Sequence, residues 1–386
     1  MKRSDQLFAL LILALGILSC SPVPEIKKET SGWRNRLDSL LTEEVAAERF
    51  SGTVAVGNRD SLLFVFAGGE ADRNWHIPIK RGTRFDICSL NKSFIAALVL
   101  KAVEERKLEL DDKLVDLLAE YSYSGNFHPG ITVHSMLNHS SGLPNYEELP
   151  DSLKENWLYG YKHLHFSNPE YVNFISKLPA HRAPGEGFYY SNFAYHLLPI
   201  LLEDVYQKPF PDILAEKVVQ PLNLRFTYAS VNNQEVHPQL AEAYNPQPDG
   251  SWQRNNYIDL SLSRRIFSTS EDLYRWAKAL NKPGFLSESS LELMFSNQLG
   301  AIDTTVSYGY GWAIHPSHSD YKMGNLGMDQ PYSIHGGATE GYRSMLVNVN
   351  GGQYILAFLS NVGSNTNEIA LARKITHLLT SSTHEN

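Results

Sequence analysis

The sequence predicts an α/β fold, an αβα sandwich in which helices flank one antiparallel sheet built from both ends of the chain. β-Like runs occur near the start, within residues 52–69, and again near the end, within residues 308–360. The stretch between them is mostly helical in character, so we expect a large helical insertion at residues 109–261. The α/β part then consists of residues 32–108 and 262–382.

Residues 1–20 have the pattern of an export signal. Lys2 and Arg3 supply positive charge, and residues 7–18 form a twelve-residue apolar stretch that is too short to span a bilayer. The stretch ends on the letters ILSC, residues 17–20, which resemble the lipobox of bacterial lipoproteins. We therefore expect a lipoprotein signal peptide; a plain secretory signal is the alternative.

Cys20 is the residue that lipid would modify, and it would become the first residue of the mature chain. Residues 21–31 would form a polar tether between a membrane of the bacterial cell envelope and a periplasmic domain at residues 32–382. Cys88 is the only other cysteine, so no disulfide is possible once Cys20 carries lipid. We interpret Cys88 as a small packed residue; a second nucleophile is the alternative.

Apolar spacing predicts the elements of the first part of the chain. An amphipathic helix is marked by apolar residues three and four apart, at Leu37, Leu40, Leu41 and Val45. Two β-like runs separated by the turn-like NRD predict a hairpin, GTVAVG at 52–57 and LLFVFAGG at 62–69. The mostly helical region begins with LELDDKLVDLLA, residues 108–119.

The rest of the sheet is expected at the end of the chain. A helix at residues 268–280, STSEDLYRWAKAL, starts with Ser or Thr capping and with acidic residues in its first turn. Three strand-like runs follow, YGYGWAIH at 308–315, YRSMLVNV at 342–349 and QYILAFLS at 353–360. A last helix is expected at roughly residues 367–379.

Composition limits the possible partners. The 386 residues are 42% hydrophobic and 20% charged, as in an ordinary soluble protein with a large core. The net charge of −8, with no stripe of lysine or arginine, argues against a nucleic-acid partner. The expected partners are a small-molecule or peptide substrate and, through the lipid anchor, a membrane. The sequence does not indicate an oligomeric state.

Ser89 and Lys92 stand at the start of an apolar helix. The segment FDICSLNKSFIAALVLKAVEE, residues 85–105, has seven apolar residues in succession from Phe94 to Leu100. Helical residues three apart share a face and lean toward the N-terminus, so Lys92 should lie over the Ser89 hydroxyl. The helix dipole disfavours a cation there. Either Lys92 is a solvent-exposed lysine after an N-cap serine, or it helps to remove a proton from a serine nucleophile.

Two further triplets lie in favourable local contexts. Tyr190-Ser191-Asn192 follows a proline-glycine turn at the start of a helix, and His335-Gly336-Gly337 comes just before a strong strand. Ser319 and Lys322 repeat the Ser89 spacing, but in a polar loop with no helix behind them. Rival triplets lack the turn or the strand: Tyr171-Val172-Asn173, His128-Pro129-Gly130, Lys282-Pro283-Gly284 and Lys322-Met323-Gly324.

Together these motifs resemble the β-lactamase-related serine hydrolases, which include class C β-lactamases, D-alanyl-D-alanine carboxypeptidases, D-amino peptidases and related esterases. The S-D-N and K-T-G triplets of penicillin-recognising enzymes are replaced by Tyr-Ser-Asn and His-Gly-Gly. The resemblance runs from about residue 50 to residue 361 in seven ordered segments: FSGTVAV, TRFDICSLNKSF, ITVHSMLNHSSGLP, APGEGFYYSN, STSEDLYRWAKAL, YGYGW and HGGATEGYRSML. It implies a β-lactamase/transpeptidase-like fold.

The resemblance also implies a role for each residue of a catalytic group. Ser89 attacks a carbonyl carbon and becomes an acyl-enzyme. Tyr190 is the general base, and Lys92 is its partner. Asn192 orients Lys92 and the acyl side of the substrate.

Substrate contacts are implied along the third triplet. His335 should lie near the general base, on the leaving-group side. Gly336 and Gly337 should let a substrate approach the strand backbone closely. The N–H groups of Ser89 and Ala338 should form the oxyanion hole.

Two departures from the family pattern bear on function. Arg264 and Arg265 stand close to a place where the family often has glycines, and they are either surface residues or cations near the mouth of the cleft. His335 replaces the lysine of class C β-lactamases. Because an imidazole is largely neutral above its ordinary pKa of about 6.5, it should hold a substrate carboxylate less firmly than an ammonium does.

The expected function is serine hydrolysis through an acyl-enzyme on Ser89, without metal or cofactor. The expected substrates are D-amino-acid peptides, cleaved as by a carboxypeptidase, or carboxylic esters, with weak action on β-lactams. One alternative is a true β-lactamase. Another is a catalytically inactive binding or regulatory lipoprotein, against which the intact Ser89, Lys92 and Tyr190 argue. A metallohydrolase would need an HExxH motif or clustered ligands, which the sequence lacks.

Overall fold

The computed structural model describes residues 32–151, 166–231, 235–254, 264–339 and 341–381. The expected signal peptide, the tether and the lipidation site Cys20 lie outside the described residues. Within the described ranges, no helix is both long enough and apolar enough to cross a membrane.

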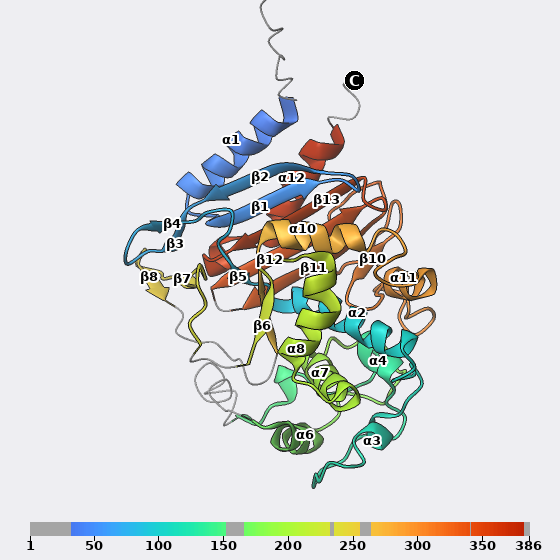
Figure 1. Cartoon of the computed structure of the whole chain (residues 1–386). Coiled ribbons are helices and arrows are strands. Elements are labelled where there is room, and N and C mark those ends of the chain that lie inside the picture. The colour runs from blue at the N-terminus through green and yellow to red at the C-terminus, as the bar shows by residue number, and fades with distance from the viewer. Residues whose placement is uncertain (1–31, 152–165, 232–234, 255–263, 340, 382–386) are drawn as a thin grey trace, which may run out of the picture.

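The main sheet is built from both ends of the chain, which confirms the predicted fold class (Figure 1). In the described part of the chain it has six antiparallel strands, in the order β10-β11-β12-β13-β1-β2. Their bounds are β1 Gly52–Gly57, β2 Leu62–Gly68, β10 Ala313–His315, β11 Tyr332–Thr339, β12 Tyr342–Val349 and β13 Tyr354–Ser360. β1 and β2 form the predicted hairpin, and β1 pairs with β13 from Gly52 opposite Ser360 to Gly57 opposite Ile355.

Helices cover both faces of this sheet (Figure 1). They are α1 (Gly32–Ala46) and α12 (Glu368–Ser381) on one face and α10 (Ser270–Ala279) on the other. Successive side chains of β13 enter different cores: Leu356 and Phe358 pack with α1 and α12, whereas Ile355 and Ala357 pack with α10. Because strand side chains alternate between faces, both faces of the sheet are buried.

The insertion packs around the buried helix α2 (Asn91–Glu104), whose Phe94 stacks on Trp276 of α10 with ring centroids 4.2 Å apart. α7 (Asn192–Tyr206) lies against α2. The other helical elements of the insertion are short: α3 Leu114–Leu117, α4 Val133–Leu137, the 3₁₀ turn Tyr146–Glu148, α6 Asn168–Ser176, α8 Phe210–Leu214, the π-helical turn Ala215–Val219 and α9 Gln220–Leu222. α11 (Glu288–Phe295) and the 3₁₀ turn Gly363–Asn365 belong to the last part of the chain.

The insertion also contributes strands, although the sequence suggested mainly helices. They are β6 (Tyr228–Ser230) and the hairpin of β7 (Tyr244–Pro246) and β8 (Trp252–Arg254). β6 pairs with β9 (Arg265–Ser268), which pairs with β5 (Phe85–Asp86). Because β5 leads directly to Ser89, this small sheet positions the start of α2.

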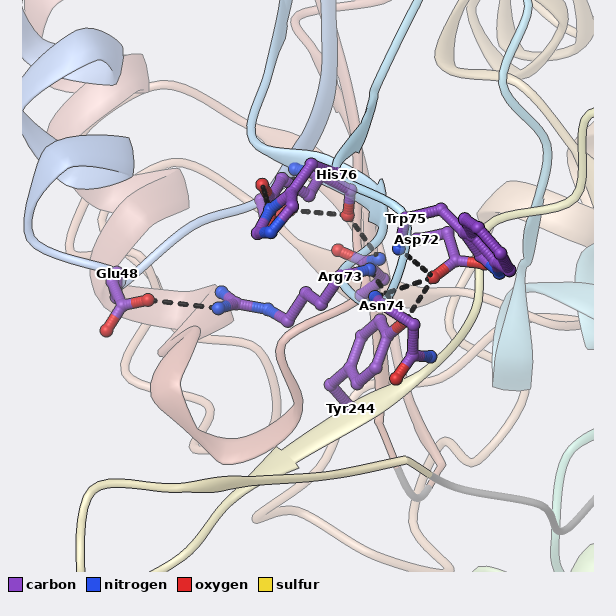
Figure 2. Close-up of polar contacts among 10 residues, drawn as sticks. Glu48, Asp72, Arg73, Asn74, Trp75, His76 and Tyr244 are labelled. Carbon is purple, nitrogen blue, oxygen red and sulfur yellow. Dashed lines mark hydrogen bonds and ion pairs between the residues drawn. The ribbon is translucent and has the colours of Figure 1, made fainter.

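A small hairpin of β3 (Glu70–Asp72) and β4 (Ile77–Pro78) joins the first part of the chain to the insertion. Figure 2 shows Arg73 at its turn, extended toward Glu48. Arg73 Nη1 donates to Glu48 Oε1 at 3.0 Å, and the Arg73 N–H donates to the Tyr244 hydroxyl of β7 at 2.8 Å. These bonds tie the end of the α1 segment to β7.

Two predicted elements are shorter than their sequence patterns. Within residues 108–119 the helix spans Leu114–Leu117, and within residues 308–315 the strand spans Ala313–His315. The second difference has a clear cause at Gly311, whose φ is +77°. A Cβ there would lie 2.8 Å from backbone atoms in the first turn of α2, so the chain turns against α2 instead of extending the strand.

Candidate active site

Ser89 lies in a sharp turn between β5 and α2, within the 3₁₀ turn Cys88–Leu90. Cys88 has a φ of +52°, which residues other than glycine rarely adopt. Asp86 Oδ1 accepts the Cys88 N–H at 2.7 Å and holds this conformation. The Cys88 side chain is buried, with Sγ 3.4 Å from Thr339 Oγ1, in keeping with a packed residue.

Lys92 is buried and points at Ser89. Lys92 is only 3% exposed, so the alternative of a solvent-exposed lysine is wrong. Nζ lies 3.3 Å from Ser89 Oγ and donates to Asn192 Oδ1 at 2.9 Å. The spacing of three residues at the start of α2 therefore places Lys92 beside Ser89, as the sequence predicted.

Asn192 is oriented by a residue that the sequence analysis did not single out. Both the backbone N–H and the Nδ2 of Asn192 donate to Asn145 Oδ1, each at 3.1 Å. Because Nδ2 is engaged with this acceptor, Oδ1 is the atom left to face Lys92. Asn145 directly follows HSSGLP, the end of a segment that carried the family resemblance. That position was the one signal in the sequence that could have identified Asn145 as a site residue.

Tyr190 shares a cavity of about 380 Å³ with Ser89 and Asn192. The other walls include residues 335–338 of β11 and the first residues of α12. Lys92 Nζ lies 4.9 Å from the centroid of the Tyr190 ring. The structure thus brings Ser89, Lys92, Tyr190 and Asn192 together, although they come from the starts of α2 and α7, a hundred residues apart.

His335 is buried, and its partners define its tautomer. Nδ1 lies 2.7 Å from the Gly336 carbonyl oxygen, which can only accept, so Nδ1 carries the ring proton. Nε2 then accepts from the Tyr308 hydroxyl at 3.1 Å. The His335 and Tyr190 ring centroids are 6.5 Å apart, so His335 lies near Tyr190 as expected. Tyr308 is a second partner that the sequence analysis missed.

The charge state of His335 is more extreme than the sequence suggested. Burial, and after it the positive charge of Lys92, lower the pKa of His335 to about 3. Burial likewise lowers the pKa of His139, beneath Tyr190, well below its ordinary value. The His335 imidazole is therefore neutral at pH 5 as well as at pH 7, and the His139 imidazole is neutral at pH 7.

The His335 triplet lies within strand β11, which the sequence analysis did not predict, and the strong strand expected just after the triplet is β12. β10 pairs with residues 332–334 of β11, so from residue 335 onward that edge of β11 faces the Ser89 turn. A Cβ on Gly337 would lie 2.7 Å from Ser89 N and from Cys88 Cβ. Gly337 is thus required by the approach of β11 to the nucleophile turn. It also lines the cavity, so its expected contact with substrate stays a prediction. Gly336 and Ala338 line the cavity.

Arg264 and Arg265 are neither surface residues nor cations at a cleft mouth, which corrects both alternatives. They are 6% and 7% exposed. Arg264 Nη2 lies 2.8 Å from Glu203 Oε2. Arg265 forms an ion pair with Asp86 and donates to Thr339 Oγ1 at 3.3 Å. Because a buried guanidinium needs a partner, both serve as internal braces, and Arg265 braces the carboxylate that holds the Ser89 turn.

The rival motifs have separate surroundings. Tyr171 is buried on α6, with its hydroxyl 2.7 Å from His196 Nδ1. Ser319 Oγ lies 3.0 Å from His315 Nδ1, and Lys322 is exposed. A wider surface groove of about 720 Å³ runs beside α11, and its lining includes none of the predicted site residues. Among the residues that the structure describes, no three His, Cys, Asp or Glu side chains are grouped to hold a metal ion.

The arrangement is suited to acyl transfer. A serine hydroxyl lies at the start of a helix, an amine and a phenol lie beside it, and the backbone of a strand edge runs close to the serine N–H. A carbonyl group in the cavity could be attacked by the hydroxyl while backbone N–H groups stabilise the developing oxyanion.

Comparisons with known proteins agree with this geometry. A family model described as Beta-lactamase matches residues 37–380. Penicillin-binding protein 4* of Bacillus subtilis (strain 168) is 25% identical over 366 residues, which cover 90% of this chain and 76% of that protein. D-amino acid amidase from Ochrobactrum anthropi SV3 has a TM-score of 0.75 at 22% identity, over 92% of this chain and 100% of the other. EstCE1, a hydrolase with promiscuous acyltransferase activity, has a TM-score of 0.72 at 19% identity, over 90% and 98%.

Proposed function

Because the chain belongs to the Beta-lactamase family and is a serine hydrolase in kind, we propose that it cleaves D-amino-acid peptide bonds, as a carboxypeptidase does, or carboxylic ester bonds. The reaction passes through an acyl-enzyme on Ser89, and β-lactams are poor substrates. The observation that carries the proposal is the set of contacts from Ser89 Oγ to Lys92 Nζ at 3.3 Å and on to Asn192 Oδ1 at 2.9 Å, beside Tyr190 in one cavity.

Acylation begins when Tyr190, in the role of general base, takes the proton of Ser89 Oγ on its side-chain oxygen. The Ser89 oxygen forms a bond to the carbonyl carbon of the substrate, and the π electron pair of the carbonyl moves to its oxygen. The N–H groups of Ser89 and Ala338 donate to this oxyanion. The Lys92 ammonium stabilises the negative charge that passes between Tyr190 and Ser89.

The tetrahedral intermediate then collapses. The bond to the amine or alcohol leaving group breaks, and the leaving group takes the proton from the Tyr190 hydroxyl. Water next attacks the acyl carbon and gives a proton to Tyr190. Ser89 leaves with the electron pair of its bond and recovers that proton, so that the acid product and the starting enzyme are formed.

His335 supports the order of substrates. A β-lactam presents a carboxylate beside its reacting amide, and a neutral imidazole with both nitrogens engaged has no charge to offer it. Simple esters carry no such carboxylate, so a neutral His335 does not weaken their binding. The name of one similar protein, a D-amino acid amidase, favours amides, and that of another, a hydrolase with promiscuous acyltransferase activity, agrees with transfer of an acyl group.

The proposal is tested by a turnover screen of p-nitrophenyl esters, D-amino-acid amides and a chromogenic cephalosporin, with Ser89→Ala as the control. We expect turnover of an ester or amide that the alanine variant lacks. A preference for the cephalosporin would identify a β-lactamase instead. Absence of turnover, together with no labelling of Ser89 by a fluorophosphonate, would identify a catalytically inactive binding lipoprotein.

We also propose that the protein acts in the periplasm of a bacterial cell, anchored to a membrane by lipid on Cys20. Support comes from the positive start of the chain, the twelve-residue apolar stretch at residues 7–18 and the ILSC letters that follow. A lipid anchor would keep the enzyme near substrates of the cell envelope.

A further inference from the structure

His139 contacts three consecutive residues, Tyr189 to Ser191. The Tyr189 N–H donates to the His139 carbonyl oxygen at 2.8 Å. The Ser191 N–H donates to His139 Nδ1 at 3.2 Å. Between these two hydrogen bonds the Tyr190 ring packs on the imidazole, with centroids 4.3 Å apart and planes inclined by 34°. One residue therefore holds the ring of Tyr190 and the backbone on both sides of it.

The backbone conformation of His139 makes this double contact possible. His139 follows α4 and has a φ of +62°, in the left-handed region. Few residues other than glycine adopt that region readily, and asparagine and histidine are among them. In this conformation both the carbonyl oxygen and the ring of His139 reach the same segment.

The acceptor at Nδ1 is present only in the neutral ring. Because Nδ1 accepts the Ser191 N–H, the ring proton is on Nε2. Burial, followed by the charge of Lys92 and the neighbouring His335, lowers the pKa of His139 well below its ordinary value. The hydrogen bond to Ser191 therefore persists at neutral and mildly acidic pH.

The surroundings of the other ring nitrogen, Nε2, indicate that His139 does more than fill space in the core. His139 is 0% exposed, and within the described part of the chain its Nε2 has no hydrogen-bond partner. The rings of Tyr195 and Tyr308 lie 4.9 and 5.0 Å from it, between centroids. A buried N–H without a partner destabilises a fold, and a phenylalanine would fill the same space without that penalty. The presence of a histidine at this position is thus explained by the hydrogen bond that its Nδ1 accepts from the Ser191 N–H.

We propose that His139 is a positioning residue for Tyr190, and that its Nδ1 sets where the Tyr190 hydroxyl lies relative to Ser89. This rests on the proposed function, in which Tyr190 is the general base. A base must come within about 2.6–3.2 Å of the proton it takes. A displacement of about 1 Å can lower the rate by about 10²-fold. Because His139 is not among the residues that line the cavity, whereas the edge of β11 is, the loss should fall on kcat and not on KM.

Two variants separate the acceptor from the ring. His139→Asn offers an amide oxygen where Nδ1 lies and tolerates the left-handed backbone. His139→Phe keeps the ring and loses the acceptor. We expect the asparagine variant to keep kcat within about fivefold of wild type, and the phenylalanine variant to lose about 10- to 100-fold in kcat with little change in KM. Because phenylalanine adopts the left-handed backbone less readily than asparagine, His139→Gly, which tolerates that backbone and also lacks the acceptor, is measured beside it. Thermal unfolding verifies that all three variants are folded. Equal kcat values in the variants with and without the acceptor would overturn the proposal.

A double-mutant cycle shows whether His139 acts through Tyr190. In a Tyr190→Phe background there is no hydroxyl to position, so His139→Phe should lower kcat by no more than about twofold further. If the two losses multiply, His139 acts independently and this inference alone is overturned. If Tyr190→Phe by itself keeps full activity, the base role in the proposed function fails, and the inference fails with it.

Discussion

The charge on Lys92 organises the site at the scale of single residues. Its ammonium donates to Asn192 and lies against Ser89. After burial, the same charge is a cause of the lowered pKa values of His139, His196 and His335. Burial and this one cation together keep the surrounding imidazoles neutral, and the positive charge stays next to the nucleophile.

Tyr190→Phe keeps the ring that packs on His139 but removes the oxygen that accepts a proton. We expect kcat on a p-nitrophenyl ester to fall by about 10²–10⁴-fold, the usual effect of losing a general base. Ser89→Ala should abolish the acyl-enzyme, which intact-mass spectrometry detects. A fully active phenylalanine variant would assign the base role to Lys92 alone.

His335→Lys places a cation where the wild type has a neutral ring. We expect the ratio of kcat/KM for a chromogenic cephalosporin to that for an ester to rise in this variant, because the ammonium can hold the β-lactam carboxylate. In the wild type the ratio should not rise between pH 7 and pH 5, since the pKa of His335 is about 3. A rising ratio on acidification would show that His335 becomes protonated within that range.

At the scale of elements, the approach of β11 to the Ser89 turn sets the oxyanion hole. Gly337 and Gly336 form a matched pair for testing this approach. A Cβ at 337 would meet the backbone N of Ser89 at 2.7 Å, whereas a Cβ at 336 first meets the flexible end of Met345 at 3.1 Å. An alanine at 337 therefore requires a shift of backbone, whereas an alanine at 336 requires only a shift of a side-chain end.

Gly337→Ala should displace the strand from the nucleophile turn. We expect kcat/KM to fall by about 10²-fold or more, as when an oxyanion-hole donor is lost. Gly336→Ala should lose less than about tenfold, because a methionine tip can shift. Steady-state kinetics on one ester measures both, with thermal unfolding as the check on folding. Equal losses would show that strand approach is not the limiting feature.

At the scale of the whole molecule, the two chain ends share one sheet, and buried histidines occur both in that sheet and in the insertion. His139, His196 and His335 have pKa values below the ordinary value of about 6.5. Between that value and the folded pKa, the unfolded chain binds protons that the folded chain does not. The stability that these neutral histidines contribute is therefore fully present above about pH 6.5, and it is lost as the pH falls toward their pKa values in the folded chain.

We accordingly expect the free energy of unfolding to decrease from pH 7 to pH 5. The slope reaches at most about 1.4 kcal/mol per pH unit for each such histidine. Urea denaturation at the two pH values measures the decrease, and His335→Gln should reduce it by the share of one histidine. Equal free energies at both pH values would contradict the assignment of neutral, buried imidazoles.

The proposed anchor is also a property of the whole chain. Expressed in a bacterial host, the protein should partition with membranes and require detergent for extraction. Cys20→Ala should release it or stop its processing, because no other residue of the apparent lipobox can carry the lipid. Equal membrane retention of the alanine variant would refute the lipid anchor.

Local patterns in the sequence were sufficient for most of the main sheet and for the core of the site, whereas β11 was not predicted. The alternation and length of the apolar runs predicted β1, β2, β12 and β13, because side-chain period is a local property of a strand. The Ser89–Lys92 pair could be predicted for the same reason: residues three apart on a helix meet whatever the rest of the fold does. The family resemblance that the ordered motifs carry then implied that Tyr190 and His335 belong to the same site.

Only the tertiary structure decided burial and orientation. Arg264 and Arg265 are internal because Glu203 and Asp86, distant in sequence, supply their counter-charges. Asn145 turns the Asn192 amide, and His139 holds Tyr190, across gaps of about fifty residues. A pKa and a side-chain orientation depend on what surrounds a group in three dimensions, and a local pattern of letters does not contain that environment.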